Sequence, residues 1–75
     1  MITLRGTKIM KIILNGQQKM LSAEQNLRQL IEQCCKQSNR VIAELNGTII
    51  KTTTWDQTKL KEGDIVELVS FVGGG

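Results

Sequence analysis

The sequence predicts an α+β domain in which one main helix packs on one face of a mixed sheet of four to five strands. Three observations indicate this fold: two Asn-Gly pairs between apolar segments, one apolar stripe at helical spacing, and a final, mostly apolar segment at residues 65–72. A length of 75 residues allows one small domain. The 40% of hydrophobic residues and the absence of proline exclude a disordered or low-complexity composition.

The first hairpin is predicted at residues 11–21. Residues 11–14 are mostly β-branched and aliphatic, and they end at Asn15-Gly16, a pair that suits a type I′ turn because both central residues need positive φ. Residues 17–21 then form the return strand. Residues 1–9 are a short basic lead that we expect to be poorly ordered, so the predicted domain comprises residues 10–72.

The main helix is predicted between the two hairpins, ending at residues 38–39. Its apolar stripe follows the i, i+3, i+4, i+7 spacing of one helix face: Leu27, Leu30, Ile31 and Cys34. Asn26 with Gln29 can form a capping box, and Ser22 with Gln25 is a rival start one turn earlier. We expect Cys34 to be buried on this face and Cys35, about 100° farther round the helix, to be partly exposed.

A second hairpin and a last strand follow. In residues 40–45 the core positions 41, 43 and 45 alternate with outward-facing positions, and Asn46-Gly47 turns this strand into residues 48–51. Residues 52–60 cross irregularly, with Trp55 expected in the core. After a turn at residues 62–64, residues 65–72 form the last strand, in which Val66 and Leu68 face the core and Glu67 faces outward.

The composition excludes several classes of site. The chain has no histidine and two cysteines, which excludes imidazole-based catalysis and a self-contained four-ligand zinc site. No apolar run approaches the ~20 residues of a membrane span, so we expect no membrane partner. The net charge of +3 lies mainly in the first 20 residues, and Trp55 and Phe71 are the only aromatic residues, so nucleic-acid binding is disfavoured.

The cysteines and acidic residues offer no catalytic site. Cys34 and Cys35 are adjacent, which hinders a disulfide, and residues 1–9 lack the apolar region of a secretion signal. We therefore expect a reducing compartment, the cytoplasm or an equivalent organelle stroma. A persulfide on Cys35 is disfavoured, because no histidine or cationic pocket accompanies it. Asp56, Asp64 and Glu67 are expected to be solvated charges.

Three glycines, Gly73, Gly74 and Gly75, follow the last strand. Glycine buries no side chain and loses the most entropy on ordering, so this segment does not reinforce the fold. One interpretation is a frayed tail. The other is a flexible arm with a reactive carboxylate, because residues without Cβ can thread a narrow channel and leave the carbonyl open to attack. ATP would convert that carboxylate to an acyl-adenylate, and a sulfur nucleophile would convert the adenylate to a thiocarboxylate.

Residues 10–75 carry a set of motifs that together resemble a known family. The motifs are Ile12-Ile13-Leu14-Asn15-Gly16, the helix with Leu27, Leu30 and Ile31, Leu45-Asn46-Gly47, Trp55, Leu60-Lys61-Glu62-Gly63-Asp64-Ile65-Val66-Glu67 and Val72-Gly73-Gly74-Gly75. With them, the chain resembles the ThiS family, the sulfur carriers of thiamine biosynthesis. The order hairpin, helix, hairpin, crossing and returning strand also matches the ubiquitin-like β-grasp fold.

The resemblance implies a carrier protein rather than an enzyme. Gly75 would be the residue that is adenylated and thiocarboxylated, with Gly73 and Gly74 as the threading arm. The implied partners are a ThiF-type, ubiquitin-activating-like adenylyltransferase that uses ATP, a cysteine desulfurase that supplies sulfur, and a ThiG-type thiazole synthase that receives it; no cofactor is permanently bound.

Residues beside the arm are candidate anchors for these partners: Val69, Phe71 and Val72. Alternatively, Phe71 fills the edge of the sheet.

Other functions stay open at this point. The small subunit of molybdopterin synthase also ends in Gly-Gly and uses a thiocarboxylate, but members often carry proline before the glycines, which this chain lacks. A non-covalent β-grasp module that binds RNA or protein would have an inert tail. A protein modifier would join its tail to lysines.

Overall fold

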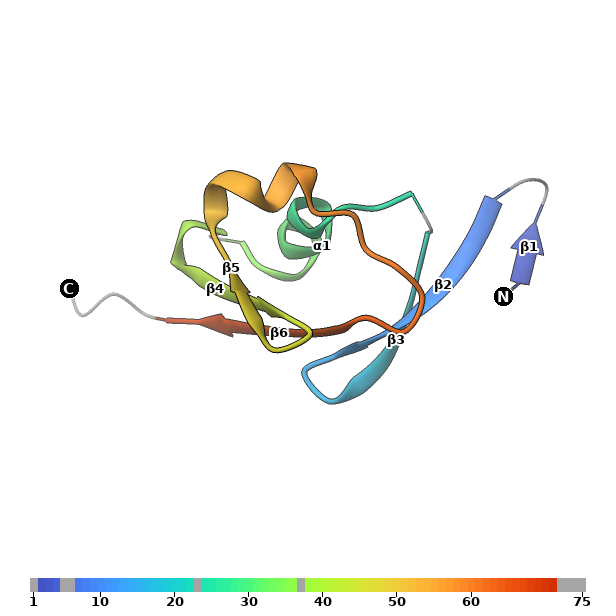
Figure 1. The fold of residues 1–75 in the computed structure, drawn as a ribbon, viewed down its shortest axis with the longest axis horizontal. Coiled ribbons are helices and arrows are strands. Elements are labelled where there is room, and N and C mark those ends of the chain that lie inside the picture. The colour runs from blue at the N-terminus through green and yellow to red at the C-terminus, as the bar shows by residue number, and fades with distance from the viewer. Residues whose placement is uncertain (1, 5–6, 23, 37, 72–75) are drawn as a thin grey trace.

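The structure is a computed structural model that describes residues 2–4, 7–22, 24–36 and 38–71. Its elements in chain order are β1 (Ile2–Leu4), β2 (Thr7–Leu14), β3 (Gln17–Ser22), α1 (Leu27–Cys34), the 3₁₀ helix η1 (Ser38–Arg40), β4 (Val41–Leu45), β5 (Thr48–Ile50), the 3₁₀ helix η2 (Thr52–Gln57) and β6 (Ile65–Ser70). Figure 1 shows α1 and η2 on the same side of the sheet. The predicted α+β architecture with one main helix is confirmed.

The sheet is mixed because the last strand returns beside the first hairpin. β6 runs parallel to β2 and antiparallel to β4, and β5 pairs with the outer edge of β4. β3 pairs with β2 along residues 9–14, while β1 and β6 share the opposite edge of β2 at residues 7–9 and 13–14. Strands β2 to β6 form the predicted β-grasp sheet, and β1 is a sixth strand that the sequence did not indicate.

The two Asn-Gly pairs form the predicted turns. Asn15 and Asn46 have φ of 49° and 50°, and Gly16 and Gly47 follow at 82° and 87°. Two consecutive positive φ angles match the right-handed twist of the flanking strands. These turns set the register of β2 with β3 and of β4 with β5.

The helix begins at the predicted cap. Asn26 Oδ1 accepts from the Gln29 backbone N–H at 2.8 Å, and Gln29 Oε1 accepts from the Asn26 N–H at 2.9 Å, so two otherwise unpaired donors are satisfied. The rival Ser22 instead ends β3. The buried core comprises Met10, Ile12, Leu21, Leu27, Leu30, Ile31, Val41, Ala43, Trp55, Leu60 and Val66.

The predicted burial of Cys34 is wrong, whereas Cys35 is partly exposed, as predicted. The helix ends at Cys34, whose side chain is exposed, and Cys35 adopts extended backbone angles of φ −133° and ψ 131°. Cys35 therefore does not continue the helix, and it packs against the core. The i+7 spacing from Leu27 fails because the helix stops at that position, four residues before the expected end.

The first nine residues contain strand structure. β2 begins at Thr7 rather than near Met10, and Ile2–Leu4 pairs with Thr7–Ile9. Figure 1 places this hairpin at one end of the elongated molecule, with β6 running toward the other end. The boundaries of the lead, domain and glycine arm stay predictions.

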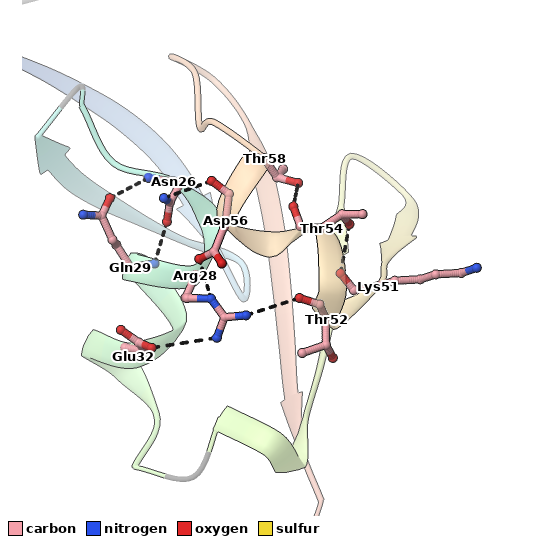
Figure 2. A network of polar contacts seen from close by, with 9 residues as sticks. All are labelled: Asn26, Arg28, Gln29, Glu32, Lys51, Thr52, Thr54, Asp56 and Thr58. Carbon is pink, nitrogen blue, oxygen red and sulfur yellow. Dashed lines mark hydrogen bonds and ion pairs between the residues drawn. The ribbon is translucent and has the colours of Figure 1, made fainter.

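Residues 52–57 form η2, which seals one end of the core. Trp55 is 1% exposed, as predicted, and its indole Nε1 donates to the Ile50 carbonyl at 3.0 Å. Arg28 joins η2 to α1, because its guanidinium contacts the Asp56 carboxylate and lies 5.6 Å from the centre of the Trp55 ring. Figure 2 shows Arg28 with Asp56 and with Thr52, whose carbonyl accepts from Arg28, and the Asn26 cap lies beside them.

Candidate functional site

The exposed large hydrophobic side chains gather on the sheet face away from the helix. Among the described residues they are Met20, Ile42, Ile49, Ile65, Val69 and Phe71. Each of the first five alternates along its strand with a residue that packs into the core, and Phe71 follows directly after β6. Together we call these six residues the apolar open face.

Strand register places two residues of this face directly beside each other. Ile42 of β4 is the direct cross-strand partner of Val69 of β6, and Val69 is 57% exposed. Ile49 of β5 is 65% exposed and lies opposite Glu44. Exposed apolar side chains gathered on one face of a small domain are typical of a protein-binding site.

The predicted anchors Val69 and Phe71 are both exposed on this side of the sheet. Phe71 is 46% exposed, and its backbone N–H donates at 2.9 Å to the carbonyl of Arg40, the residue before β4, so the chain stays hydrogen-bonded to this segment up to Phe71. Val72 and the glycines Gly73, Gly74 and Gly75 lie outside the described residues. Their predicted roles, and those of Val69 and Phe71 in partner binding, stay predictions.

Sequence reasoning missed most of the apolar open face. Ile42 occupies an outward position of a strand whose alternating pattern is evident in the sequence, so the two-residue period of a strand was enough to predict that Ile42 is exposed. The same argument applies to Ile65, because Val66 beside it was assigned to the core. The signal that was missed is an apolar residue at an outward position.

The strand that leads to the glycines is held from both sides by turn asparagines. Asn15 Oδ1 accepts from the Leu68 N–H at 2.8 Å, and its Nδ2 donates to the Leu68 carbonyl at 3.3 Å. On the other side, Asn46 Oδ1 accepts from the Ile65 N–H at 2.9 Å. Both side chains therefore extend the backbone pairing of β6 beyond the sheet ladders.

The prediction of a solvated Asp64 is wrong. Asp64 is 6% exposed, and its carboxylate accepts from the Lys61 N–H at 2.7 Å and from Asn46 Nδ2 at 3.1 Å. The carboxylate thus closes the turn before β6 and ties it to the Asn46 turn. Asp56 is exposed as expected but forms an ion pair with Arg28, and Glu67 is exposed as expected.

The structure gives Cys35 no activating surroundings. Burial, followed by the neighbouring Cys34, raises the pKa of the Cys35 thiol, which disfavours the nucleophilic thiolate. Within the described residues, no group of three or more Cys, Asp or Glu side chains is placed to hold a metal ion. No helix in this part of the chain has the length and apolar character needed to cross a membrane.

Comparisons with known proteins agree with the fold. The chain is 32% identical to a ThiS thiamine biosynthesis protein from Geobacter metallireducens, and the structures match with a TM-score of 0.76 over 88% of this chain and 100% of that one. It is also 32% identical over 66 residues, 88% of its length, to a thiazole synthase from Paramagnetospirillum magneticum. The chain spans only 20% of that curated relative. The ThiS family model matches residues 12–75, so the chain belongs to the ThiS family.

Proposed function

We propose that this protein is a sulfur carrier of thiamine biosynthesis whose reactive group is the C-terminal carboxylate of Gly75. The observation that carries the proposal is the family match, which extends through the three glycines to residue 75. The exposed apolar open face beside the last strand supports it, because a carrier must be held by other proteins while its tail reacts.

The proposed chemistry has two steps. In the first, the Gly75 carboxylate attacks the α-phosphorus of ATP, pyrophosphate leaves, and an acyl-adenylate forms. In the second, a persulfide from the cysteine desulfurase attacks the activated carbonyl, AMP leaves, and an acyl disulfide forms. A thiol such as cysteine then reduces its S–S bond, which leaves the thiocarboxylate on Gly75. Gly73 and Gly74 have no Cβ, which lets the tail pass a narrow channel.

Partner proteins would catalyse both steps, so the chain acts as a carrier rather than as an enzyme. We propose a ThiF-type adenylyltransferase that binds the ATP, a cysteine desulfurase as the source of sulfur, and a ThiG-type thiazole synthase as the acceptor. The similarity to part of a thiazole synthase supports the last partner, because carrier and acceptor segments then occur in one polypeptide. Val69, Phe71 and Val72 would contact these partners, in a reducing compartment such as the cytoplasm.

Intact-mass spectrometry tests the proposal directly. The protein is incubated with ATP, a ThiF-type enzyme and a cysteine desulfurase with cysteine. We expect a mass gain equal to the replacement of one oxygen by sulfur, localised to the C-terminal peptide. A variant without Gly75, and one with a residue appended after it, keep the fold and should gain nothing.

Two results would overturn the proposal. One is an unmodified mass when the same enzymes modify another ThiS protein. The other is an isopeptide adduct to lysine, which identifies a protein modifier. A second assay separates the thiamine carrier from a molybdopterin-type carrier. The thiocarboxylated protein is offered to a thiazole synthase and, separately, to a molybdopterin synthase large subunit. Sulfur transfer to the large subunit alone would refute the thiamine assignment.

A further inference from the structure

Strand β2 ends while its parallel partner β6 continues. Among the described residues the two strands pair at 13–14 and 65–66, and β6 runs on to Ser70. On its other edge, β6 pairs with β4 as far as Ser70, and the Phe71 N–H reaches the Arg40 carbonyl. Backbone pairing alone would therefore hold the end of β6, next to the glycines, from one side.

The side chain of Asn15 takes the place of the missing continuation of β2. In a parallel ladder, a residue donates its N–H to one residue of the neighbouring strand and accepts from the residue two positions farther along. Asn15 makes the first of these bonds with its backbone, from its N–H to the Val66 carbonyl at 2.9 Å. The chain turns at Asn15, where φ is 49°, and the second bond comes from the side chain, because Oδ1 accepts from the Leu68 N–H at 2.8 Å.

The amide nitrogen of Asn15 makes the bond that follows in such a ladder. Nδ2 donates to the Leu68 carbonyl at 3.3 Å, where a longer parallel strand would present its next backbone N–H. A carboxamide carries a carbonyl acceptor and an N–H donor, as a peptide group does, so this side chain replaces one peptide unit of the ladder. Aspartate also suits the turn but lacks the donor, and glycine lacks both groups.

The group that Asn15 holds must move if the end of β6 is released. The Leu68 carbonyl and the Val69 N–H belong to one planar peptide unit. Asn15 holds this unit on the β2 side, and Ile42 of β4 is the cross-strand partner of Val69 on the other side. Rotation of this unit, which would release residues 69–71, therefore breaks the bond to Asn15 as well as the pairing with β4.

Asn46 occupies the same turn position but supports the other end of the strand. Its side chain bonds to Ile65 and Asp64, at the start of β6, and residues 66–70 pair with β4 independently of it. Asn15 acts at Leu68, close to the glycines. The two turns thus separate the support of the start of β6 from the support of its end.

Resting on the proposed function, we infer that Asn15 is a positioning residue for the reaction of the tail. Its amide fixes β6 through Phe71, so the segment that carries the Gly75 carboxylate starts from a fixed point. Without the amide, the segment that must span to a partner lengthens from residues 72–75 to residues 69–75. The effective concentration of a tethered group falls roughly as the −3/2 power of tether length, so the carboxylate is diluted about twofold at the nucleotide.

The test measures the first-turnover rate of pyrophosphate release by the full chain with saturating ThiF-type enzyme and ATP. Asn15→Gly should lower this rate about twofold. Asn46→Gly is the matched control, because it makes the same change at the same turn position and loses a bond to the buried Asp64 carboxylate, yet it should keep the rate of the parent. A role in stability alone predicts the reverse order. Arg28→Met, which is altered on the helix side, is the control if Asn46→Gly is incompletely folded.

Hydrogen exchange of the free protein provides a second measurement. Asn15→Gly should speed exchange of the Val69 amide about tenfold, the factor that corresponds to two exposed hydrogen bonds, whereas Asn46→Gly should not, because this opening is local. Equal rates of pyrophosphate release in Asn15→Gly and the parent, a loss at least as large in the control, or unchanged exchange at Val69 would overturn the inference.

The parent protein separates this inference from the proposed function. If the parent releases pyrophosphate and then gains sulfur on Gly75, and Asn15→Gly reacts as fast, the positioning role alone is refuted. If the parent neither releases pyrophosphate nor gains sulfur with enzymes that modify another ThiS protein, the proposed function is refuted.

Discussion

The turn residues Asn15 and Asn46 offer a matched pair of substitutions that perturb β6. Asn46→Gly and Asn15→Gly both retain a residue suited to positive φ, so each removes only side-chain hydrogen bonds. The entropy that glycine adds to the unfolded chain is common to both variants and cancels when they are compared.

The two losses differ because Asn46 bonds to a charged, buried group. The Asn46→Gly variant loses a neutral hydrogen bond from the Ile65 N–H, worth about 1 kcal/mol, and a part-buried hydrogen bond to the Asp64 carboxylate, worth about 2 kcal/mol. Asn15 loses two exposed bonds to the Leu68 backbone, one of them 3.3 Å long, worth together about 1.5 kcal/mol. We expect Asn46→Gly to be less stable than Asn15→Gly by about 1.5 kcal/mol.

Urea unfolding at neutral pH, followed by the fluorescence of Trp55, measures both free energies of unfolding. The difference corresponds to a melting temperature about 6–12 °C lower for Asn46→Gly. In an Asp64→Ala background the Asn46→Gly loss should fall to about 1 kcal/mol, because the charged partner is already gone. Equal losses in the two glycine variants, or an undiminished loss in that background, would refute the assignment of Asp64 as the charged anchor of this turn.

Two further predictions concern the helix. Arg28→Met should lower the free energy of unfolding by about 1 kcal/mol, because the ion pairs with Asp56 and Glu32 and the contact with the Trp55 ring are lost. High salt should reduce this difference between the variant and the parent, since it screens the ion pairs. Urea unfolding at two salt concentrations measures it, and the same difference at both would contradict an electrostatic contribution. The raised pKa of Cys35 means that the folded state favours its neutral thiol, so this stabilisation is present below the ordinary thiol pKa of 9.0 and is lost as the pH rises through and above it. Thiol labelling of Cys34→Ser should therefore require a higher pH than labelling of Cys35→Ser, and coincident pH profiles would contradict the burial of Cys35.

The features that the sequence predicted well are those encoded within a few residues. An Asn-Gly pair specifies its turn because few other residues adopt two successive positive φ angles. Asn26 and Gln29 satisfy each other's backbone donors within one helical turn, so their spacing alone indicates the helix start. Alternation placed Val66 in the core and Glu67 outside it without knowledge of the neighbouring strands.

The features that the sequence did not reveal depend on contacts between distant segments. Asp64 is buried because Asn46, 18 residues earlier, turns its amide toward the carboxylate. The helix ends at Cys34, where the chain becomes extended and Cys35 packs against the core, although the apolar spacing from Leu27 includes Cys34. The opposition of Glu44 and Glu67 follows from the register of β4 with β6, which no local pattern specifies.

The position of Phe71 limits how the proposed activating enzyme is built. Residues 72–75 follow Phe71, and a fully extended chain advances at most about 3.5 Å per residue, so the carboxylate reaches at most about 14 Å beyond Phe71. Phe71 is held to the Arg40 carbonyl, and β6 is fixed by Asn15 and Asn46, so the strand itself cannot lengthen this reach without losing those bonds. In the proposed complex, the nucleotide of the partner therefore lies within about 14 Å of the surface that contacts Phe71. Inserting glycines after Phe71 should lower the rate of thiocarboxylation, because a longer tail lowers the effective concentration of the carboxylate at that nucleotide.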